Sequence, residues 1–154
     1  MFWLSGDKIF ERRLTKTIYE ETQVEAREVS LTAAAVYELT ERGELDFGGS
    51  EFKAAGRREI RPKKRSASDD YGWWELEEGD YLLELNEQLS LLPEETAVIE
   101  PHNNLLKGGA TQPGKRFSGE LDELKLILPL RVPAAGLAIK ENARTTSLRV
   151  LKAS

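Results

Sequence analysis

The stretch that decides the fold is residues 123–132, ELKLILPLRV. Its leucines stand at every second position, at Leu124, Leu126, Leu128 and Leu130. Residues two apart share a face in an extended strand, whereas a helix of about 3.6 residues per turn spreads them around its axis. The stretch therefore predicts a β-strand with one buried face.

The same alternation recurs on both sides of this strand. Residues 80–86 place Tyr81, Leu83 and Leu85 on one face. Other extended segments are predicted at 24–31, 36–39, 96–99, 135–140 and 144–151. A short helix is predicted after Ser5, which can act as its N-cap. Many short strands separated by turn signals indicate an all-β sandwich or barrel, and we expect a single domain over residues 1–154.

Composition excludes several classes of protein. The chain has no cysteine and a single histidine, His102, so thiolate metal sites, cysteine nucleophiles and histidine-rich metal cages are excluded. A net charge of −5 gives no overall attraction for nucleic-acid polymers or anionic membranes. No apolar run is long enough for a membrane span, and we expect a cytoplasmic protein. Abundant Glu, Lys and Arg with one Met favour a thermophilic source.

Two segments each allow two interpretations. Residues 57–70 are rich in arginine and lysine, which fits either a phosphate-binding patch or a solvated loop. The pair Trp73–Trp74 could be a surface anchor, or could place one ring in the core. For the first segment the solvated loop is favoured because no aromatic residues are interleaved for stacking, and for the second the core position is favoured.

Turn-forming glycine, proline and asparagine residues are most frequent in residues 100–121, EPHNNLLKGGATQPGKRFSGEL. An apolar strand leads into polar amides, a glycine pair and a Pro-Gly turn, and a second leucine-rich strand follows. This arrangement resembles the dUTPase and dCTP deaminase family, in which Pro-Arg-Ser-Ser-Leu-Leu-Arg is followed by Asp-Pro-Gly-Tyr-x-Gly. Three more segments are similar to family segments in the same order, at residues 29–47, 79–87 and 140–148.

The resemblance implies a distorted β-barrel or jelly-roll, assembled as a homotrimer with nucleotide sites between subunits. It implies dUTP or a related deoxynucleotide as ligand, with Mg²⁺ on the phosphates. The positions that match the family's nucleotide-binding motifs are His102, Asn103, Asn104, Lys107, Gln112, Phe117 and Gly119.

The departures from the family fall on the chemistry. Gln112 stands where the family has the aspartate that deprotonates the attacking water. An amide can orient a water molecule but cannot accept its proton, and a general base contributes about 10²–10⁴-fold. Leu124 occupies the position of the deaminase glutamate, and Ser30 replaces an early aspartate. His102 and Lys107 replace arginines, so the bidentate phosphate fork is lost.

We therefore expect a dUTPase-related, deoxynucleotide-binding trimer that lacks the standard pyrophosphatase and deaminase residues. One alternative is an active dUTP diphosphatase that uses relocated carboxylates, for which Glu100, Glu120 and Asp122 are the candidate Mg²⁺ ligands. Another is a non-catalytic interaction scaffold. His102 itself could contact a phosphate, mediate a trimer contact, or satisfy a nearby backbone carbonyl as a turn residue.

Overall fold

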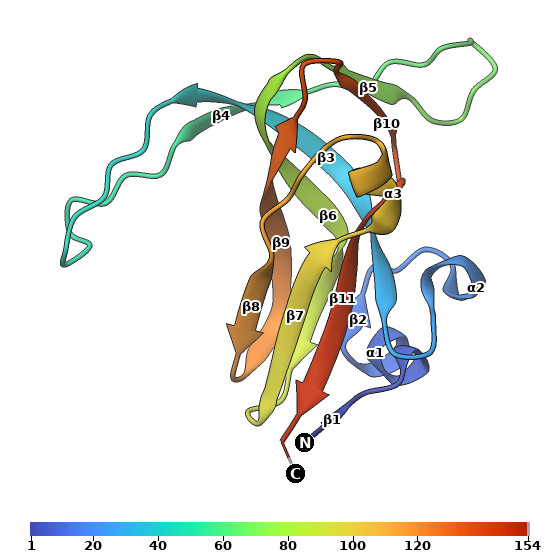
Figure 1. Ribbon diagram of the computed structural model, residues 1–154, viewed down its shortest axis with the longest axis vertical. Coiled ribbons are helices and arrows are strands. Elements are labelled where there is room, and N and C mark those ends of the chain that lie inside the picture. Colours follow the sequence, from blue (N-terminus) through green and yellow to red (C-terminus); the bar gives the residue numbers. More distant parts are fainter. Residues whose placement is uncertain (154) are drawn as a thin grey trace.

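A computed structural model describes residues 1–153 as an antiparallel β-structure with three short helices (Figure 1). The helices are α1 (Gly6–Arg12), α2 (Glu20–Gln23) and α3 (Asn103–Lys107). The strands are β1 (Phe2–Trp3), β2 (Leu14–Thr15), β3 (Val29–Glu41), β4 (Gly56–Ile60), β5 (Trp73–Leu76), β6 (Gly79–Leu91), β7 (Glu95–Pro101), β8 (Lys115–Ser118), β9 (Leu121–Val132), β10 (Leu137–Lys140) and β11 (Arg144–Lys152). The all-β class and the short N-terminal helix predicted from the sequence are both confirmed.

Strand β3 connects the two layers of the sandwich. Its first residues, 29–32, pair with β11, and residues 33–38 pair with β6. The main sheet runs in the order β2-β6-β3-β11-β7-β8, with β9 added on β6, β4 on β3 and β1 on β11, while β5 and β10 form a separate ribbon. Because one bent strand serves both layers, the β6–β9 layer lies across the core from the β11–β7–β8 layer.

The core follows the alternation that the sequence shows. Leu126, Leu128 and Leu130 of β9 are each 1% exposed, and they pack with Leu83 and Leu85 of β6 in one hydrophobic cluster. Fully burying a side chain of this size stabilises the fold by about 1.5–3 kcal/mol. Leucine spacing therefore specified both the strands and the face that each buries.

Helix α1 begins where the sequence predicts. The Ser5 side chain accepts a hydrogen bond from the Lys8 N–H at 3.2 Å, which caps the helix, and Asp7 and Arg12 lie in its first and last turns. Both charges suit the helix dipole. The helix buries Ile9 against the sandwich. Arg13, the first residue after the helix, is therefore placed at the edge of the core.

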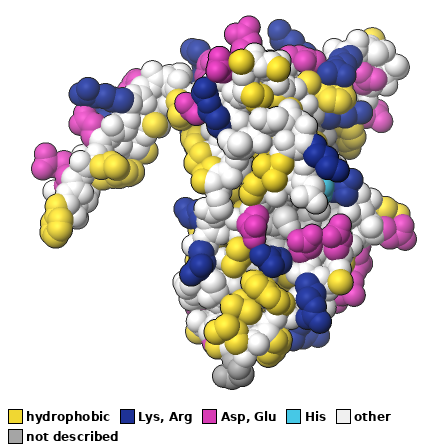
Figure 2. Space-filling view, in the orientation of Figure 1, with side chains coloured by type: hydrophobic (Ala, Val, Ile, Leu, Met, Phe, Trp, Pro, Cys, Tyr) yellow, Lys and Arg dark blue, Asp and Glu magenta, His cyan; other side chains and the backbone are white. Residues whose placement is uncertain are grey.

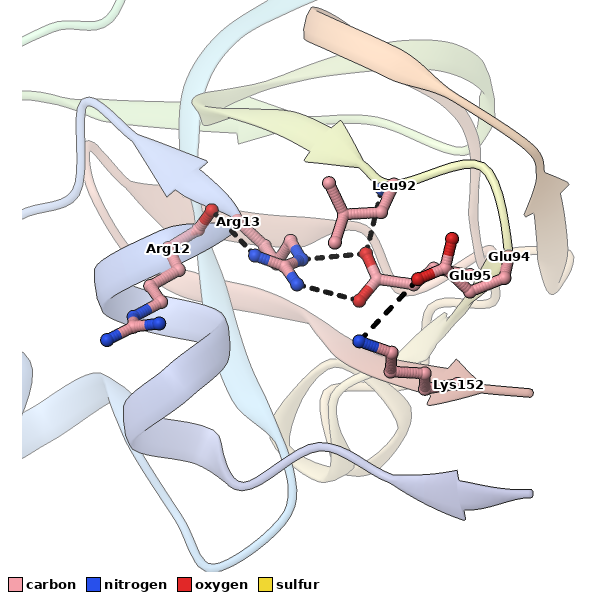
Figure 3. Close-up of polar contacts among 6 residues, drawn as sticks. All are labelled: Arg12, Arg13, Leu92, Glu94, Glu95 and Lys152. Carbon is pink, nitrogen blue, oxygen red and sulfur yellow. Dashed lines mark hydrogen bonds and ion pairs between the residues drawn. The ribbon is translucent and has the colours of Figure 1, made fainter. Parts of the chain in front are cut away.

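Arg13 forms a buried ion pair with Glu95 (Figure 3). Its Nε and Nη2 atoms each donate to a Glu95 carboxylate oxygen at 2.7 Å. Glu95 also accepts from the Leu92 N–H at 2.8 Å, and Lys152 lies nearby, paired with Glu94 at 3.5 Å. Burial raises the pKa of Glu95, but Arg13, the Leu92 N–H and Lys152 together lower it below its usual value. This pair ties the N-terminal segment to the β6–β7 turn.

Some elements differ from the sequence-based expectation. The segment expected to be extended from residue 24 is instead a turn that follows α2, with an isolated bridge between Val24 and Val29, and the strand begins at Val29. Helix α3 was not predicted, because five residues are too few to show helical periodicity. Residues 57–60 belong to β4, and the arginines of the basic segment are partly neutralised: Arg58 pairs with Glu38, and Arg65 with Glu75.

The tryptophan pair is divided as the core interpretation predicted. Trp74 is 1% exposed, and its indole N–H donates to the Ile60 carbonyl at 2.9 Å. Trp73 is half-buried, and the Arg65 guanidinium lies over its ring at 3.6 Å from the centroid. The pair anchors β5 to the end of β4.

Residues 42–55, between β3 and β4, project from the body as a long arm, which leaves the molecule on the left of Figure 1. Figure 2 shows hydrophobic side chains along this arm. None of the helices in residues 1–153 combines the length and the apolar character that crossing a membrane requires.

Candidate functional site

A cavity of about 580 Å³ opens on the side of the molecule that carries α2, α3 and β10 in Figure 1. Its walls come from the α2 segment, the start of α3, and the turn that joins β10 to β11. The polar and aromatic side chains in its lining are those of Tyr19, Thr22, Gln23, Thr32, Trp73, Asn104, Lys140, Glu141, Asn142, Arg144 and Thr145. This mixture provides cations, amides and aromatic rings on one surface.

The carboxylate of Glu87 in β6 is fully buried and lies beneath the cavity, where it contacts two of the lining residues. Its oxygens accept from the Thr32 N–H at 2.9 Å, the Thr32 hydroxyl at 2.6 Å and the Gln23 amide at 2.9 Å. Burial raises the pKa of Glu87, although these hydrogen bonds act to lower it. Since Thr32 and Gln23 also line the cavity, this network fixes the side chains of the floor.

A second polar chain extends the floor toward β11. Asn86 donates to the Thr32 hydroxyl and to the Asn142 side-chain oxygen, both at 2.9 Å. Asn142 adopts a left-handed backbone conformation with φ of 68°, and its N–H donates to the Ala33 carbonyl at 2.9 Å. Asparagine tolerates this conformation better than most residues. The turn between β10 and β11 is thereby held in place beside the cavity.

Two cations stand in the cavity wall. Arg144 reaches the Thr22 carbonyl at 3.5 Å and also influences the titration of both Glu25 and His102. Lys140 places its Nζ atom 5.8 Å from the centre of the Trp73 ring. A guanidinium and an ammonium on one wall can bind an anionic group, and the adjoining indole can contact a planar ring.

The cavity is the meeting point of the segments that carry the family resemblance. Residues 29–32, 86–87, 103–107 and 140–144 are far apart in sequence, and each supplies either a lining residue or part of the floor. This convergence was not visible in the sequence. Lys140, Asn142 and Arg144 lay in a segment already matched to the family, but their charge and amide groups were not assigned to a site.

His102 acts as the N-cap of α3. Its side-chain Nδ1 atom accepts a hydrogen bond from the Asn104 N–H at 2.9 Å. The backbone N–H of His102 donates to the Thr145 carbonyl at 3.0 Å. Burial lowers the pKa of His102, the Arg144 charge lowers it further, and Glu28 partly opposes this. A neutral imidazole is what an acceptor role requires. The side chain of His102 thus bonds the backbone of its own turn as expected, but the partner is the Asn104 N–H and not the carbonyl that the sequence led us to expect.

The other α3 residues that match the family's nucleotide-binding motifs differ in where they lie. Asn104 lines the cavity, whereas Asn103 and Lys107 are exposed residues of the same helix and do not line it. Leu105, between them, is buried and anchors the helix. Of the seven positions matched to nucleotide binding, Asn104 lies in the cavity wall and His102 caps the helix that carries it.

Gln112 is buried rather than presented to solvent, at 6% exposure. Its Oε1 atom accepts from the Thr146 hydroxyl at 3.1 Å, while its Nε2 atom is buried with no hydrogen-bond partner among the described residues. Gln112 is not part of the cavity lining, although the neighbouring Thr145 is. Within one chain, therefore, this amide faces the interior next to β11.

Phe117 and Gly119 lie at the opposite end of the β7–β8 hairpin from α3. Phe117 is paired with Ala97 near the start of β7, whereas α3 follows the end of that strand. At about 3.3 Å per residue, the span from Ala97 to Pro101 is about 13 Å. The single chain does not bring these two residues to the cavity.

The candidate Mg²⁺ ligands are also separated. Glu100 is paired with Arg149 at 2.6 Å, near the α3 end of β7. Glu120 and Asp122 are exposed at the β8–β9 turn. No group of three acidic, histidine or cysteine side chains in residues 1–153 is arranged to hold a metal ion. The carboxylates of the described chain do not by themselves form a magnesium site.

The comparisons with known proteins agree with one another on the fold. No protein-family model matches the chain. Its sequence is similar to that of a probable deoxyuridine 5'-triphosphate nucleotidohydrolase from Methanosarcina mazei, with 27% identity over 136 residues, which cover 88% of this chain and 75% of the relative.

Its fold is similar to that of 2'-deoxycytidine 5'-triphosphate deaminase from Agrobacterium tumefaciens. The TM-score is 0.67 at 13% identity, and the match covers 98% of this chain and 48% of the deaminase. The chain thus spans about half the length of that structure. The likeness confirms the fold that the sequence motifs predict.

Proposed function

Because this chain belongs to the dUTPase/dCTP deaminase superfamily, we propose that it is a deoxynucleotide-binding protein that lacks the standard catalytic groups of that superfamily. The observation that carries the proposal is the cavity beside α3, where the family-like segments meet around Asn104 and Arg144. A volume of about 580 Å³ lies within the range of about 300–1,000 Å³ that small-molecule sites occupy.

In this proposal each group of lining residues has its own role. Arg144 and Lys140 bind the phosphate oxygens through charge-assisted hydrogen bonds, which are about twice as strong as neutral ones. Asn104 and Asn142 orient the ligand with their amides. Trp73 and Tyr19 offer ring faces for the base or the sugar. When a triphosphate is bound, Mg²⁺ would neutralise part of the charge on its phosphates, and oxygen ligands are the ones that this ion prefers.

The loss of catalysis rests on Gln112. An amide has no site that takes a proton from water, and its oxygen is already committed to Thr146. Leu124, at the position of the deaminase glutamate, is a β9 residue packed against the core. The chain can therefore hold and orient a deoxynucleotide without activating water at these positions.

The relative from Methanosarcina mazei supports the choice of a deoxyuridine nucleotide, and the family resemblance supports a homotrimer. In a trimer, residues that lie far apart in one chain can meet across a subunit boundary. This is how Phe117 and Gly119 would contribute, since one chain alone keeps them away from Asn104.

The test measures thermal stabilisation by dUTP, dCTP and dUMP, and pyrophosphate release from dUTP and dCTP, each with Mg²⁺. We expect stabilisation by a deoxynucleotide and no release. Arg144→Met should weaken binding by about 10–150-fold, because a hydrogen bond to a charged group contributes about 1.5–3 kcal/mol. Arg149→Met is the matched control: it lies on the same strand, pairs with Glu100, and does not line the cavity. Equal nucleotide binding by the two variants would show that the nucleotide does not bind in this cavity.

One observation favours hydrolysis as a second candidate function. Glu141 is a carboxylate in the cavity wall, where one of its oxygens accepts from the Gly72 N–H at 2.8 Å. Pyrophosphate release that disappears in Glu141→Gln, but persists in Glu100→Gln, would assign water activation to Glu141 and would replace the non-catalytic proposal.

A further inference from the structure

The arm of residues 42–55 is held in shape but buries little of its apolar surface. Leu45 is 86% exposed, Phe52 is 58% exposed, and Phe47 is fully exposed. Figure 1 shows the arm extending away from the body, and Figure 2 shows hydrophobic side chains along it. Soluble monomers rarely leave such contiguous apolar surface uncovered, and exposed patches mark interaction sites.

The backbone of the arm is organised by local contacts. Glu44 and Lys53 exchange two backbone hydrogen bonds, of 2.8 and 2.9 Å. At the tip, the Asp46 carboxylate accepts from the Gly49 N–H at 3.1 Å and the Glu51 N–H at 3.0 Å. The arm is therefore a preformed hairpin, so docking it would require little ordering of its backbone.

A groove of about 980 Å³ lies between the base of the arm and the β6–β9 layer. Leu82, Pro113 and Pro129 provide apolar surface on the body side, and Arg57 and Arg131 also line the groove. The arm's own Leu45 and Phe52 form part of the opposite wall, whereas Phe47 is not part of the lining. A tip whose own stalk forms one wall of the groove is poorly placed to fill it, so the occupant comes from outside the chain.

We propose that the arm of one copy docks in this groove of a neighbouring copy, with Phe47 entering between Pro113 and Leu82. A projecting apolar tip and a hollow apolar groove on different parts of one surface form a heterologous contact, which closes into a ring when the rotation permits. Residues 44–51 carry three acidic side chains, those of Glu44, Asp46 and Glu51. The groove lining has three cations and a single acid and is therefore net positive: Lys53, Arg57, Arg131 and Asp80. Opposite charges at the rim favour this partner over an unrelated apolar one.

The inference supplies the contact for the homotrimer of the proposed function and is independent of nucleotide binding. The chain has no cysteine, so introduced thiols report without background. Phe47→Cys is mixed with a mass-tagged Pro113→Cys variant under mild oxidation, and Asp70→Cys, on an exposed loop away from the groove, replaces Pro113→Cys in the control. We expect at least roughly tenfold more mixed disulfide than in the control, because docking raises the local thiol concentration.

A second measurement determines the mass of the Phe47→Glu variant in solution by light scattering. We expect its oligomer to dissociate at concentrations at which the wild type stays assembled, with unchanged circular dichroism because the Phe47 side chain is fully exposed in its own chain. An unaltered oligomer together with no excess of mixed disulfide would overturn the docking, as would a wild type that is monomeric throughout. Deoxynucleotide stabilisation, measured on the same samples, reports on the proposed function separately.

Discussion

Two buried carboxylates, Glu95 and Glu87, meet opposite electrostatic surroundings. Glu95 faces a guanidinium that donates two hydrogen bonds, and its pKa is lowered. Glu87 is surrounded by uncharged donors, from Thr32 and Gln23, and its pKa is raised. The first ties a terminal segment to the sandwich, and the second lies beneath the cavity (Figure 3 shows the Glu95 region).

This difference separates scaffold from site. A fully paired charge holds two segments together but offers little to a ligand. A carboxylate held without a counter-ion polarises the donors around it, and these donors also form the cavity floor. Perturbed carboxylates gather at functional sites more often than in plain scaffolding. The comparison therefore supports the binding site proposed at the Glu87 end of the molecule.

The largest expected effect is at the scaffold. Arg13→Met leaves the Glu95 carboxylate buried without its partner, which costs about 3–5 kcal/mol. At about 2–4 °C per kcal/mol, thermal denaturation should shift down by about 6–20 °C. Arg12→Met, a change at the exposed neighbouring residue, should stay within about 0.5 kcal/mol of the wild type. Similar losses in the two variants would contradict the importance of the pair.

The pH dependence of stability should have opposite signs at the two carboxylates. The lowered pKa of Glu95 contributes stability above its usual value of 4.5, and this is lost as pH falls through the folded-state pKa. The raised pKa of Glu87 contributes stability that is complete below 4.5 and is lost as pH rises through its folded-state pKa.

Urea denaturation of the wild type, Glu95→Gln and Glu87→Gln at several pH values measures this contrast. The difference between wild type and Glu95→Gln should shrink on acidification below pH 4.5, whereas the loss caused by Glu87→Gln should be largest in acid and shrink as pH rises. Parallel slopes for both variants would show that the two environments are equivalent.

The smallest expected effect is at His102, between the scaffold and the cavity. His102→Ala removes the cap of α3 and should cost about 0.5–2 kcal/mol, while His102→Asn keeps a side-chain acceptor and should lose less. Because the pKa of His102 is lowered, its contribution is present above the usual value of 6.5 and is lost as pH falls through the folded-state pKa. Denaturation at pH 8 and pH 5 should show a larger loss in acid for the wild type than for His102→Asn.

Much of the fold was predictable because a half-buried strand shows an alternation of apolar and polar residues in its sequence. The spacing of Leu124 to Leu130 gave both the strand and its buried face, and Ser5 gave the start of α1. The short elements were not predictable. Helix α3 has five residues, and β4 presents mostly exposed charged side chains, so neither carries a hydrophobic period.

The candidate site was predictable only in part. The motif around residues 100–121 led to Asn104, which lines the cavity, and to His102, which caps its helix. Arg144, Lys140 and Trp73 had no local signature of binding, since an isolated cation between strands resembles any surface residue. Their role depends on which distant segments pack against them.

The sequence by itself determined the all-β class, the family resemblance and the absence of thiol chemistry, because alternation, motif order and composition are local or summed properties of the chain. Only the tertiary structure decided that Arg13 meets Glu95 across 82 residues and that four separate segments enclose one cavity. Such pairings depend on how strands exchange hydrogen bonds and on which faces bury together, and a linear pattern of polar and apolar residues is compatible with many of them.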